Sequence, residues 1–142
     1  MVQNHTIETD SVPVSTDGFE LSHGWITQPD NYADTGTSDP RIGTTTRGAS
    51  ISFPLKSASA FSVVGSVNYN HGLFNVTVTS PSSAEPVYQG RYNGSSRWIG
   101  LDTTLYLATG LNRSQTYQVE MMNDSPGWLD ISRIVVFDTP PQ

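Results

Sequence analysis

Residues 50–79 decide the fold class, because they contain three short apolar runs separated by turn residues. They read SISFPLKSASAFSVVGSVNYNHGLFNVTVT. In the last run, residues 73–79, apolar and polar side chains alternate with the two-residue period of a strand that has one buried face. The turn residues at 70–72, Asn-His-Gly, precede that run. The stretch therefore predicts several antiparallel strands joined by short loops.

The rest of the chain continues this pattern. No segment keeps a 3.6-residue period for three turns, and Ser, Thr, Val, Tyr and Gly dominate, which favours strands and tight turns over helices. Alternating runs also cover residues 105–108, 117–122 and 128–137, and the break at Ser132-Arg133 predicts a β-bulge. About eight short strands in one domain predict an all-β antiparallel sandwich of the jelly-roll type. We expect its core to include Phe53, Phe61, Phe74 and Tyr117.

Length and composition exclude several classes of protein. The 142 residues fit one domain, and the lack of cysteine excludes disulfides, thiol nucleophiles and cysteine-ligated metals. A net charge of −6 with Lys56 as the only lysine argues against nucleic acid and anionic membranes as partners. No apolar run approaches the roughly 20 residues of a membrane-spanning helix. We expect a flexible N-terminal arm over residues 1–16, a domain over 17–138 and a C-terminal tail over 139–142.

Five of the eight asparagines lie in N-glycosylation sequons. This number favours a secreted or cell-surface glycoprotein, although a chain rich in Ser and Thr forms some sequons by chance. No signal peptide is visible at the start of the chain, so this expectation depends on the sequons alone. The acceptor residues are Asn4, Asn75, Asn93, Asn112 and Asn123.

The ordered set of strand motifs resembles the galactose-binding-domain-like jelly roll of many secreted or cell-surface fungal proteins. Its motifs are FELSHGW at 19–25, GASISF at 48–53, AFSVVG at 60–65, HGLFNVTV at 71–78, GL at 110–111 and WLDI at 128–131 with IVV at 134–136. One departure is Ser80-Pro81-Ser82, where those proteins often have Asp-Gly. The resemblance implies a jelly roll related to carbohydrate-binding modules and to accessory domains of glycoside hydrolases and esterases.

Aromatic residues among polar neighbours are the candidate ligand-binding groups. Sugar rings stack their C–H faces on Trp and Tyr, while Asn, Asp, Arg or His side chains bind the hydroxyl groups. A packing role is the alternative for each of them. Trp25 and Trp128 are placed by the resemblance near the first and last strands, where they would cap one end of the core. The full candidate set is Tyr32, Tyr69, His71, Arg91, Tyr92, Trp98, Trp25 and Trp128.

A calcium ion is the metal that the resemblance implies, since galactose-binding-like folds often hold one structurally. Carboxylates suit that ion, and the candidate ligands are Asp30, Asp34, Asp39 and Asp130. The spacing in the 30–39 loop matches no known calcium loop, so Asx turns are the alternative there. The three histidines, His5, His23 and His71, lack zinc-ligand spacing.

Catalysis has little support in the sequence. No G-x-S-x-G elbow is present, and Glu20, Asp102, Glu120 and Asp130 are the carboxylates that a glycosidase could use. We therefore predict a non-catalytic carbohydrate-binding module or lectin-like domain that recognises neutral glycans or cell-wall polysaccharide. A structural or interaction ectodomain is the first alternative, and an enzyme or its accessory domain is the second. A single shallow sugar site binds weakly, so we expect a homo-oligomer or a multidomain parent to supply avidity.

Overall fold

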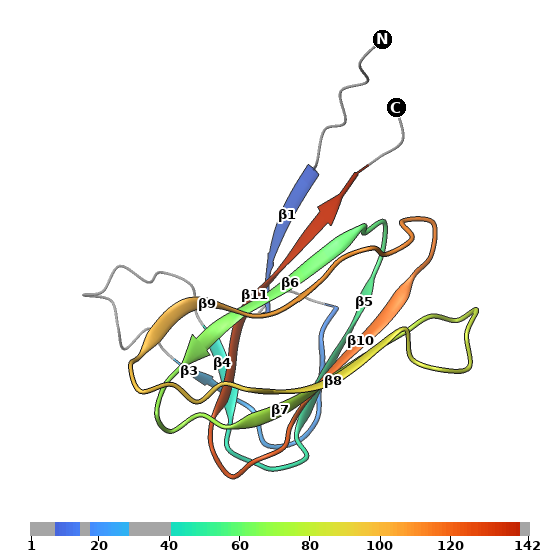
Figure 1. Ribbon diagram of the computed structural model, residues 1–142. Coiled ribbons are helices and arrows are strands. Elements are labelled where there is room, and N and C mark those ends of the chain that lie inside the picture. The colour runs from blue at the N-terminus through green and yellow to red at the C-terminus, as the bar shows by residue number, and fades with distance from the viewer. Residues whose placement is uncertain (1–7, 15–17, 29–40, 140–142) are drawn as a thin grey trace.

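The described part of the chain is a two-layer β-sandwich. The structure, a computed structural model, describes residues 8–14, 18–28 and 41–139. These ranges hold eleven strands in two antiparallel sheets (Figure 1). They contain no helix, and hence none long and apolar enough to cross a membrane. The all-β sandwich is confirmed, with eleven strands where the sequence predicts about eight. The strands at residues 8–13, 20–21, 26–28, 41–44 and 88–93 lie outside the alternating runs.

Six strands form the first sheet. They are β1 (Glu8–Pro13), β3 (Ile26–Gln28), β4 (Arg41–Thr44), β6 (Ala60–Val67), β9 (Gly100–Ala108) and β11 (Leu129–Asp138). The order is β3-β4-β11-β6-β9, and β1 pairs with β11 off this path. Along one edge β11 pairs with β6, while its other edge pairs with β4 near its start and with β1 near its end. β11 is therefore the strand that holds this sheet together.

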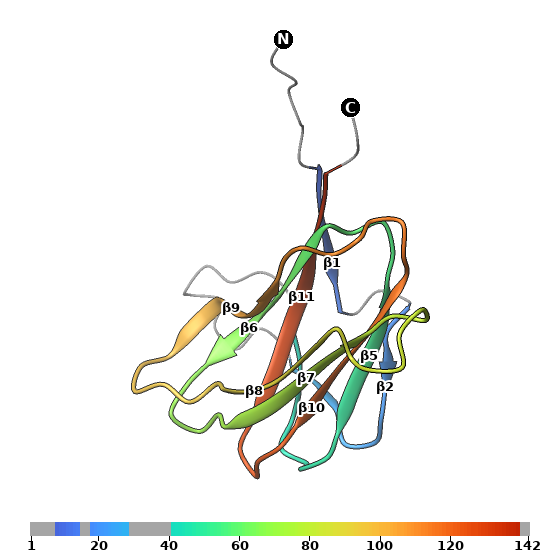
Figure 2. The same ribbon diagram turned by 45° about the vertical axis from the view of Figure 1, so that its right-hand side comes forward.

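β1 corrects the expectation of a flexible arm over residues 1–16, because residues 8–13 form a regular strand. It runs antiparallel to β11 with the register Glu8↔Asp138 to Pro13↔Arg133. Both figures of the ribbon show the two strands side by side (Figures 1 and 2). Thr9, Asp10 and Ser11 are exposed, Val12 is half-buried, and Val14, directly after the strand, lies in the core. Main-chain hydrogen bonds therefore hold the first half of this strand. A sequence pattern that depends on side-chain burial cannot reveal such a strand.

Five strands form the second sheet, whose outer face positions the groove described below. They are β2 (Glu20–Leu21), β5 (Ser50–Leu55), β7 (Leu73–Thr79), β8 (Tyr88–Asn93) and β10 (Tyr117–Asn123), in the order β2-β5-β10-β7-β8. In β5, β7 and β10 buried residues alternate with more exposed ones, as the sequence predicts. The alternation leaves a polar outer face on this sheet.

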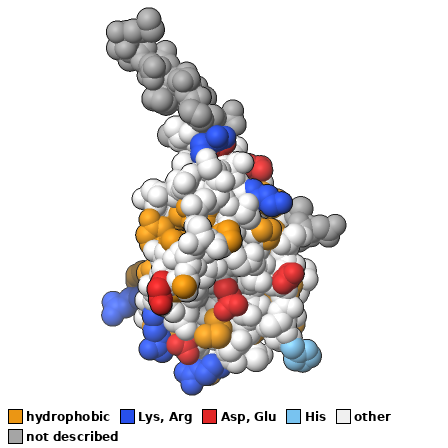
Figure 3. All heavy atoms as spheres, turned by 90° about the vertical axis from the view of Figure 1, so that its right-hand side faces the viewer, with side chains coloured by type: hydrophobic (Ala, Val, Ile, Leu, Met, Phe, Trp, Pro, Cys, Tyr) orange, Lys and Arg blue, Asp and Glu red, His pale blue; other side chains and the backbone are white. Residues whose placement is uncertain are grey.

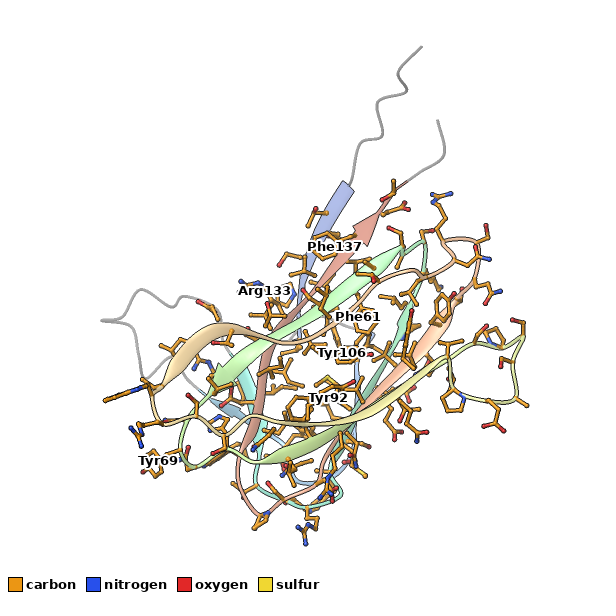
Figure 4. All side chains as sticks on the ribbon, in the orientation of Figure 1. Phe61, Tyr69, Tyr92, Tyr106, Arg133 and Phe137 are labelled. Atoms are coloured by element: carbon orange, nitrogen blue, oxygen red, sulfur yellow. The ribbon has the colours of Figure 1, made fainter. Side chains whose placement is uncertain are left out.

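The core lies between the sheets and contains the four aromatic residues expected there. Phe53, Phe61, Phe74 and Tyr117 are each 5% exposed or less. A chain of ring contacts crosses the sandwich, with centroid distances of 5.2 to 6.3 Å. Figure 4 shows three of these rings between the sheets. In order of contact, the rings belong to Phe19, Phe53, Phe61, Tyr106, Tyr92 and Phe74.

Two irregularities set which side chains of the first sheet face the core. The register of β11 against β6 shifts between Ile131 and Arg133, which confirms the predicted bulge. The second is one of two register shifts in the pairing of β6 with β9; it lies between Val63 and Val64, turns Tyr106 and Ala108 inward and leaves Leu107 56% exposed. Apolar character alone does not reveal the inward residues of β9.

The phenol of Tyr106 gives a pH-dependent prediction. Burial, followed by the neighbouring phenol of Tyr92, raises the pKa of Tyr106 to about 12 from its ordinary value of 10.0. A raised pKa in the folded state stabilises the fold fully below pH 10, and this contribution is lost as the pH rises through 12. In an alkaline absorbance titration at 295 nm, we expect an ionisation step near pH 12 that belongs to the Tyr106 phenol. Tyr106→Phe removes that step; a folded wild type with no phenol ionising near pH 12 would contradict the assignment.

Candidate functional site

Two loops at one end of the sandwich lie against each other and form the candidate site. The 68–72 loop joins β6 to β7, and the 94–99 loop joins β8 to β9. Main-chain hydrogen bonds connect them: Asn68 N–H to Gly94 O (3.3 Å), Ser96 N–H to Asn68 O (3.0 Å) and Gly94 N–H to Gly72 O (2.9 Å). A parallel bridge also pairs Asn68 with Ser95. We call these two segments the loop pair.

The loop pair presents two large aromatic side chains to solvent. Tyr69 and Trp98 are each 76% exposed, the two highest values among the exposed large hydrophobic residues described. Figure 4 shows Tyr69 pointing away from the sandwich. Exposed aromatic rings on a surface are candidate contacts for a ligand, because covering them removes apolar area from water. Both residues were predicted as ligand-binding aromatics, and their exposure is what stacking against a sugar requires.

A buried polar cluster anchors the 68–72 loop to β11. His71 Nε2 lies 2.8 Å from Asp130 Oδ2, and Ser66 donates both its main-chain N–H, at 3.0 Å, and its hydroxyl to Asp130 Oδ1. The His71 and Asp130 side chains are only 8% and 5% exposed. On its other side, His71 Nδ1 lies 3.0 Å from Asn70 Oδ1. Because the loop is fixed by main-chain bonds and by this cluster, Tyr69 is carried on a rigid support.

The cluster contains the residue types of a catalytic triad but not its geometry. In a triad the serine hydroxyl and the carboxylate contact different nitrogens of the imidazole. Here Ser66 Oγ, at 3.3 Å, and Asp130 Oδ2 both face Nε2. The serine hydroxyl also donates to Asp130, and Ser66 is 4% exposed. The arrangement locks a loop and gives no accessible, activated nucleophile.

The same contacts correct the expectation that Asp130 is a calcium ligand. Both of its oxygens already accept hydrogen bonds from protein donors, so a cation here would have to compete with Ser66 and His71 for them. Asp30, Asp34 and Asp39 lie outside the described residues. Within the described ranges, no group of three or more His, Asp or Glu side chains is arranged to hold a metal ion.

Tyr92, predicted as a ligand-binding aromatic, packs its ring against core residues while its side chain stays 37% exposed. Its ring contacts Phe74 and Tyr106, with centroids 5.8 and 5.2 Å away, and points between the sheets. Arg91, its neighbour on β8, projects from the opposite face and pairs with Asp124 at 3.0 Å. Tyr32 lies outside the described residues.

The two remaining tryptophans are both half-buried. Trp25 packs against the core, and its indole N–H donates to Ser50 O at 3.0 Å. Trp128 forms a parallel bridge with His71, and its main-chain N–H donates to Asn70 O at 2.9 Å. Trp128 thus holds the 68–72 loop through its main chain, while Trp25 has a packing role.

A groove of about 400 Å³ lies on the outer face of the second sheet. At one end Asp124 pairs with Arg91 and with Arg47, whose Nε lies 3.9 Å from it. Figure 3 shows the side of the molecule where β5 and β10 lie, with acidic and basic side chains in small groups among polar ones. The groove offers amide, hydroxyl and charged groups for hydrogen bonds. It is lined by Asn75, Thr77, Gln89, Gly90, Arg91, Glu120 and Met122.

The candidate catalytic carboxylates do not converge in a closed cleft. Glu20 and Glu120 both lie opposite Ser52, one on each side of β5, and both are exposed. Asp102 pairs with Arg133 at 3.6 Å. A general acid needs an environment that keeps its proton, such as a buried apolar wall. An open sheet face between Glu20 and Glu120 provides none.

Asn123, which was predicted as a glycosylation site, is not accessible for glycosylation in the folded structure. It is 0% exposed, and its Nδ2, the atom that would carry the glycan, donates to Thr46 O at 3.3 Å and to Gly127 O at 3.1 Å. A glycan on this nitrogen would remove both hydrogen bonds and has no room in the packed structure.

Sequence reasoning missed Ser66 and Asp124. Ser66 completes the buried cluster, and Asp124 organises one end of the groove. Their partners are distant in the chain, and only the strand register brings them together. The sequence did contain a signal for the groove. The polar residues that alternate with apolar ones along β7 and along β10 lie on the same face once these two strands are paired.

No protein-family model matches the chain, and no curated protein sequence matches it. Solved structures match its fold. The C-terminal family 6 carbohydrate-binding module of LamC, a marine laminarinase from Zobellia galactanivorans, is 16% identical with a TM-score of 0.56, covering 94% of this chain and 100% of that one. A family 36 carbohydrate-binding module in complex with calcium and xylotriose is 11% identical with a TM-score of 0.55, covering 91% and 99%.

A family two carbohydrate esterase from Cellvibrio japonicus is 12% identical with a TM-score of 0.58 over 94% of this chain, which spans 35% of that esterase. At these identities the comparisons establish the fold alone. The chain therefore has the jelly-roll β-sandwich fold of the family 6 and family 36 carbohydrate-binding modules.

Proposed function

We propose that the chain is a non-catalytic carbohydrate-binding module, or lectin-like domain, that binds neutral glycans through Tyr69 and Trp98. The observation that carries this proposal is the 76% exposure of both aromatic side chains on two loops joined by main-chain hydrogen bonds. Aromatic rings stack on the C–H faces of sugars, and a rigid support lowers the entropic cost of binding. The loop pair has both properties.

Polar groups beside the rings supply the hydrogen bonds that a sugar needs. Asn70 and Arg97 are exposed within the loop pair, next in sequence to Tyr69 and Trp98 respectively. A guanidinium and an amide are common partners of sugar hydroxyl groups. With a net charge of −6 the domain repels acidic polymers, which is why we assign a neutral ligand. We place the protein outside the cell or on its surface, where such polysaccharides occur.

Calcium remains a proposal only for the 30–39 loop, with Asp30, Asp34 and Asp39 as its ligands. Hard carboxylate oxygens suit this ion. One structural neighbour is described in complex with calcium and xylotriose. Running each binding measurement with calcium and again with a chelator tests this proposal. A calcium-dependent affinity or melting temperature supports it, and identical values in both conditions contradict it.

A glycan array, followed by calorimetry with the best oligosaccharide, tests the proposed function. We expect Tyr69→Ala and Trp98→Ala each to weaken binding about tenfold or more, since a lost stacking contact costs about 0.5–1.5 kcal/mol plus the buried area. Because both side chains are largely in water, we expect the melting temperature to stay within about 2 °C of the wild type.

Leu107→Ala is the matched control for this experiment. Leu107 is 56% exposed on β9 and lies outside the loop pair, so its loss should leave the affinity unchanged. If both aromatic variants bind as well as the wild type, the sugar binds in the groove over β7, β8 and β10 instead. A folded wild type that binds no glycan on the array would contradict the function and favour an interaction ectodomain.

A further inference from the structure

Two of the sequons in the described residues share a local geometry that the other two described sequons lack. Asn93 Oδ1 accepts the main-chain N–H of Ser95 at 2.9 Å, and Asn112 Oδ1 accepts that of Ser114 at 2.9 Å. Each is an Asx turn, in which the side-chain carbonyl bonds to the main chain two residues later. These contacts span three residues and need no tertiary structure. They can therefore form in the growing chain as well as in the folded domain.

The Asx turn leaves the side-chain nitrogen facing outward. Asn93 and Asn112 are both exposed. Across the described residues, neither Nδ2 atom donates a hydrogen bond to the protein. The hydroxyl-bearing residues of these sequons, Ser95 and Ser114, are exposed as well. Both acceptor nitrogens are thus available from solvent, with the sequon held in a fixed turn.

The flanking structure keeps each turn in place. Asn93 is the last residue of β8 and pairs with Leu73, while Ser95 forms a bridge with Asn68. Beside the other turn, Arg113 donates two hydrogen bonds to Asp138, at 2.8 and 3.1 Å. These hydrogen bonds from Arg113 hold the pKa of Asp138 below its usual value, so the pair stays charged near neutral pH.

The remaining sequons differ. Asn123 is buried with its Nδ2 occupied, as described above. Asn75 sits half-buried in the middle of β7, where its Nδ2 points toward Asp124 Oδ2 at 3.4 Å, inside the groove. Asn4 lies outside the described residues. Of the described sequons, only Asn93 and Asn112 combine the turn, the exposure and an unoccupied nitrogen.

We propose that Asn93 and Asn112 are the N-glycan acceptors among the sequons of the folded domain. In the transfer, Nδ2 bonds to C1 of an oligosaccharide carried on a polyisoprenyl diphosphate. The C1–O bond to the diphosphate breaks, the diphosphate leaves with the bonding pair, and Nδ2 gives up one proton. This proposal does not depend on whether the loop pair binds sugar.

The glycan on Asn93 would flank the groove. Residues two apart on a strand project from the same face, so Asn93 and Arg91 point to the same side of β8. A glycan there stands at the Arg91 end of the groove and beside the loop pair. It would restrict which large partners reach the groove.

The test is glycan mapping on the whole chain secreted from a eukaryotic host. Asn4→Gln and Asn75→Gln are introduced together, so that only Asn93, Asn112 and Asn123 can be modified. We expect peptide N-glycosidase F to remove two glycans and to add about 1 Da per site, because each glycosylated Asn becomes Asp. Enzymatic removal of the glycans from the unsubstituted chain in heavy-oxygen water labels each Asp that forms. Peptide mapping then identifies the glycosylated sites without any substitution.

Matched variants identify each site. Ser95→Ala and Ser114→Ala keep the asparagine and its hydrogen bond from the main-chain N–H two residues later. They remove only the hydroxyl group that the transferase needs. Each should reduce the glycan count by one and leave the circular dichroism spectrum unchanged. The proposal is overturned if Asn93 or Asn112 is bare in the secreted, folded protein, if Asn123 carries a glycan, or if Asn75 carries one in the unsubstituted chain.

Discussion

Replacing Asp130 by alanine is expected to lower the free energy of unfolding by about 3–5 kcal/mol. The substitution removes the acceptor for the main-chain N–H and hydroxyl of Ser66 and for His71 Nε2. These donors lie in a region where water cannot replace the lost bonds, since Ser66 is 4% exposed and the His71 side chain 8%. Urea unfolding followed by tryptophan fluorescence measures the loss.

Two further variants separate this explanation from a general effect of truncation. Asp130→Asn keeps one acceptor oxygen and should cost less than the alanine variant. Asp124→Ala removes a carboxylate that is 28% exposed and pairs with two exposed arginines, so we expect a loss of about 1 kcal/mol or less. Equal losses for Asp130→Ala and Asp124→Ala would contradict the role given to the buried cluster.

Gly65→Ala is expected to cost about 3 kcal/mol or more, or to prevent folding. A Cβ at Gly65 would lie 2.1 Å from the main-chain oxygen of Asp130 and 2.8 Å from Leu105 Cδ1. The first of these atoms belongs to the central strand of the sheet and cannot move without breaking its pairing with β6. Thermal unfolding by circular dichroism measures the effect.

Gly94→Ala is the matched control. It is also a buried glycine, but the nearest atom to its added Cβ, Gly72 O, lies 3.5 Å away, which is ordinary van der Waals contact. We expect a change of about 1 kcal/mol or less. If both alanine variants are equally stable, close packing at Gly65 does not constrain the sheet.

The sequence could predict the strands that have one solvent-exposed face and one buried face. Residues 50–55, 73–79 and 117–122 alternate because their outer side chains form the polar face of the second sheet. β1 escaped prediction because its residues 9–11 are all exposed and give no alternation, so its hydrogen bonds to β11 define most of it. The bulge at Ser132 was predictable because it breaks the alternation of an otherwise regular run.

The candidate site was predictable in part. Tyr69 and Trp98 stand among polar residues in loops, and the structure exposes both. Tyr92 has equally polar neighbours but lies in the inward phase of β8, where its ring meets Phe74. The contact of His71 with Asp130 joins residues 59 positions apart. Only the pairing of strands, which the sequence does not specify, places them together.

The pairing of β1 with β11 has a mechanical consequence. Glu8 and Asp138 are register partners at the same end of an antiparallel ladder, so a force that pulls these two residues apart acts across its hydrogen bonds. Such bonds lie perpendicular to the strands and would open one position at a time, as in unzipping, instead of sharing the load. β1 should therefore peel away first under tension. This would bare the edge of β11 beyond Ile131, which β4 does not cover, while Tyr69 and Trp98 stay on their separately anchored loops.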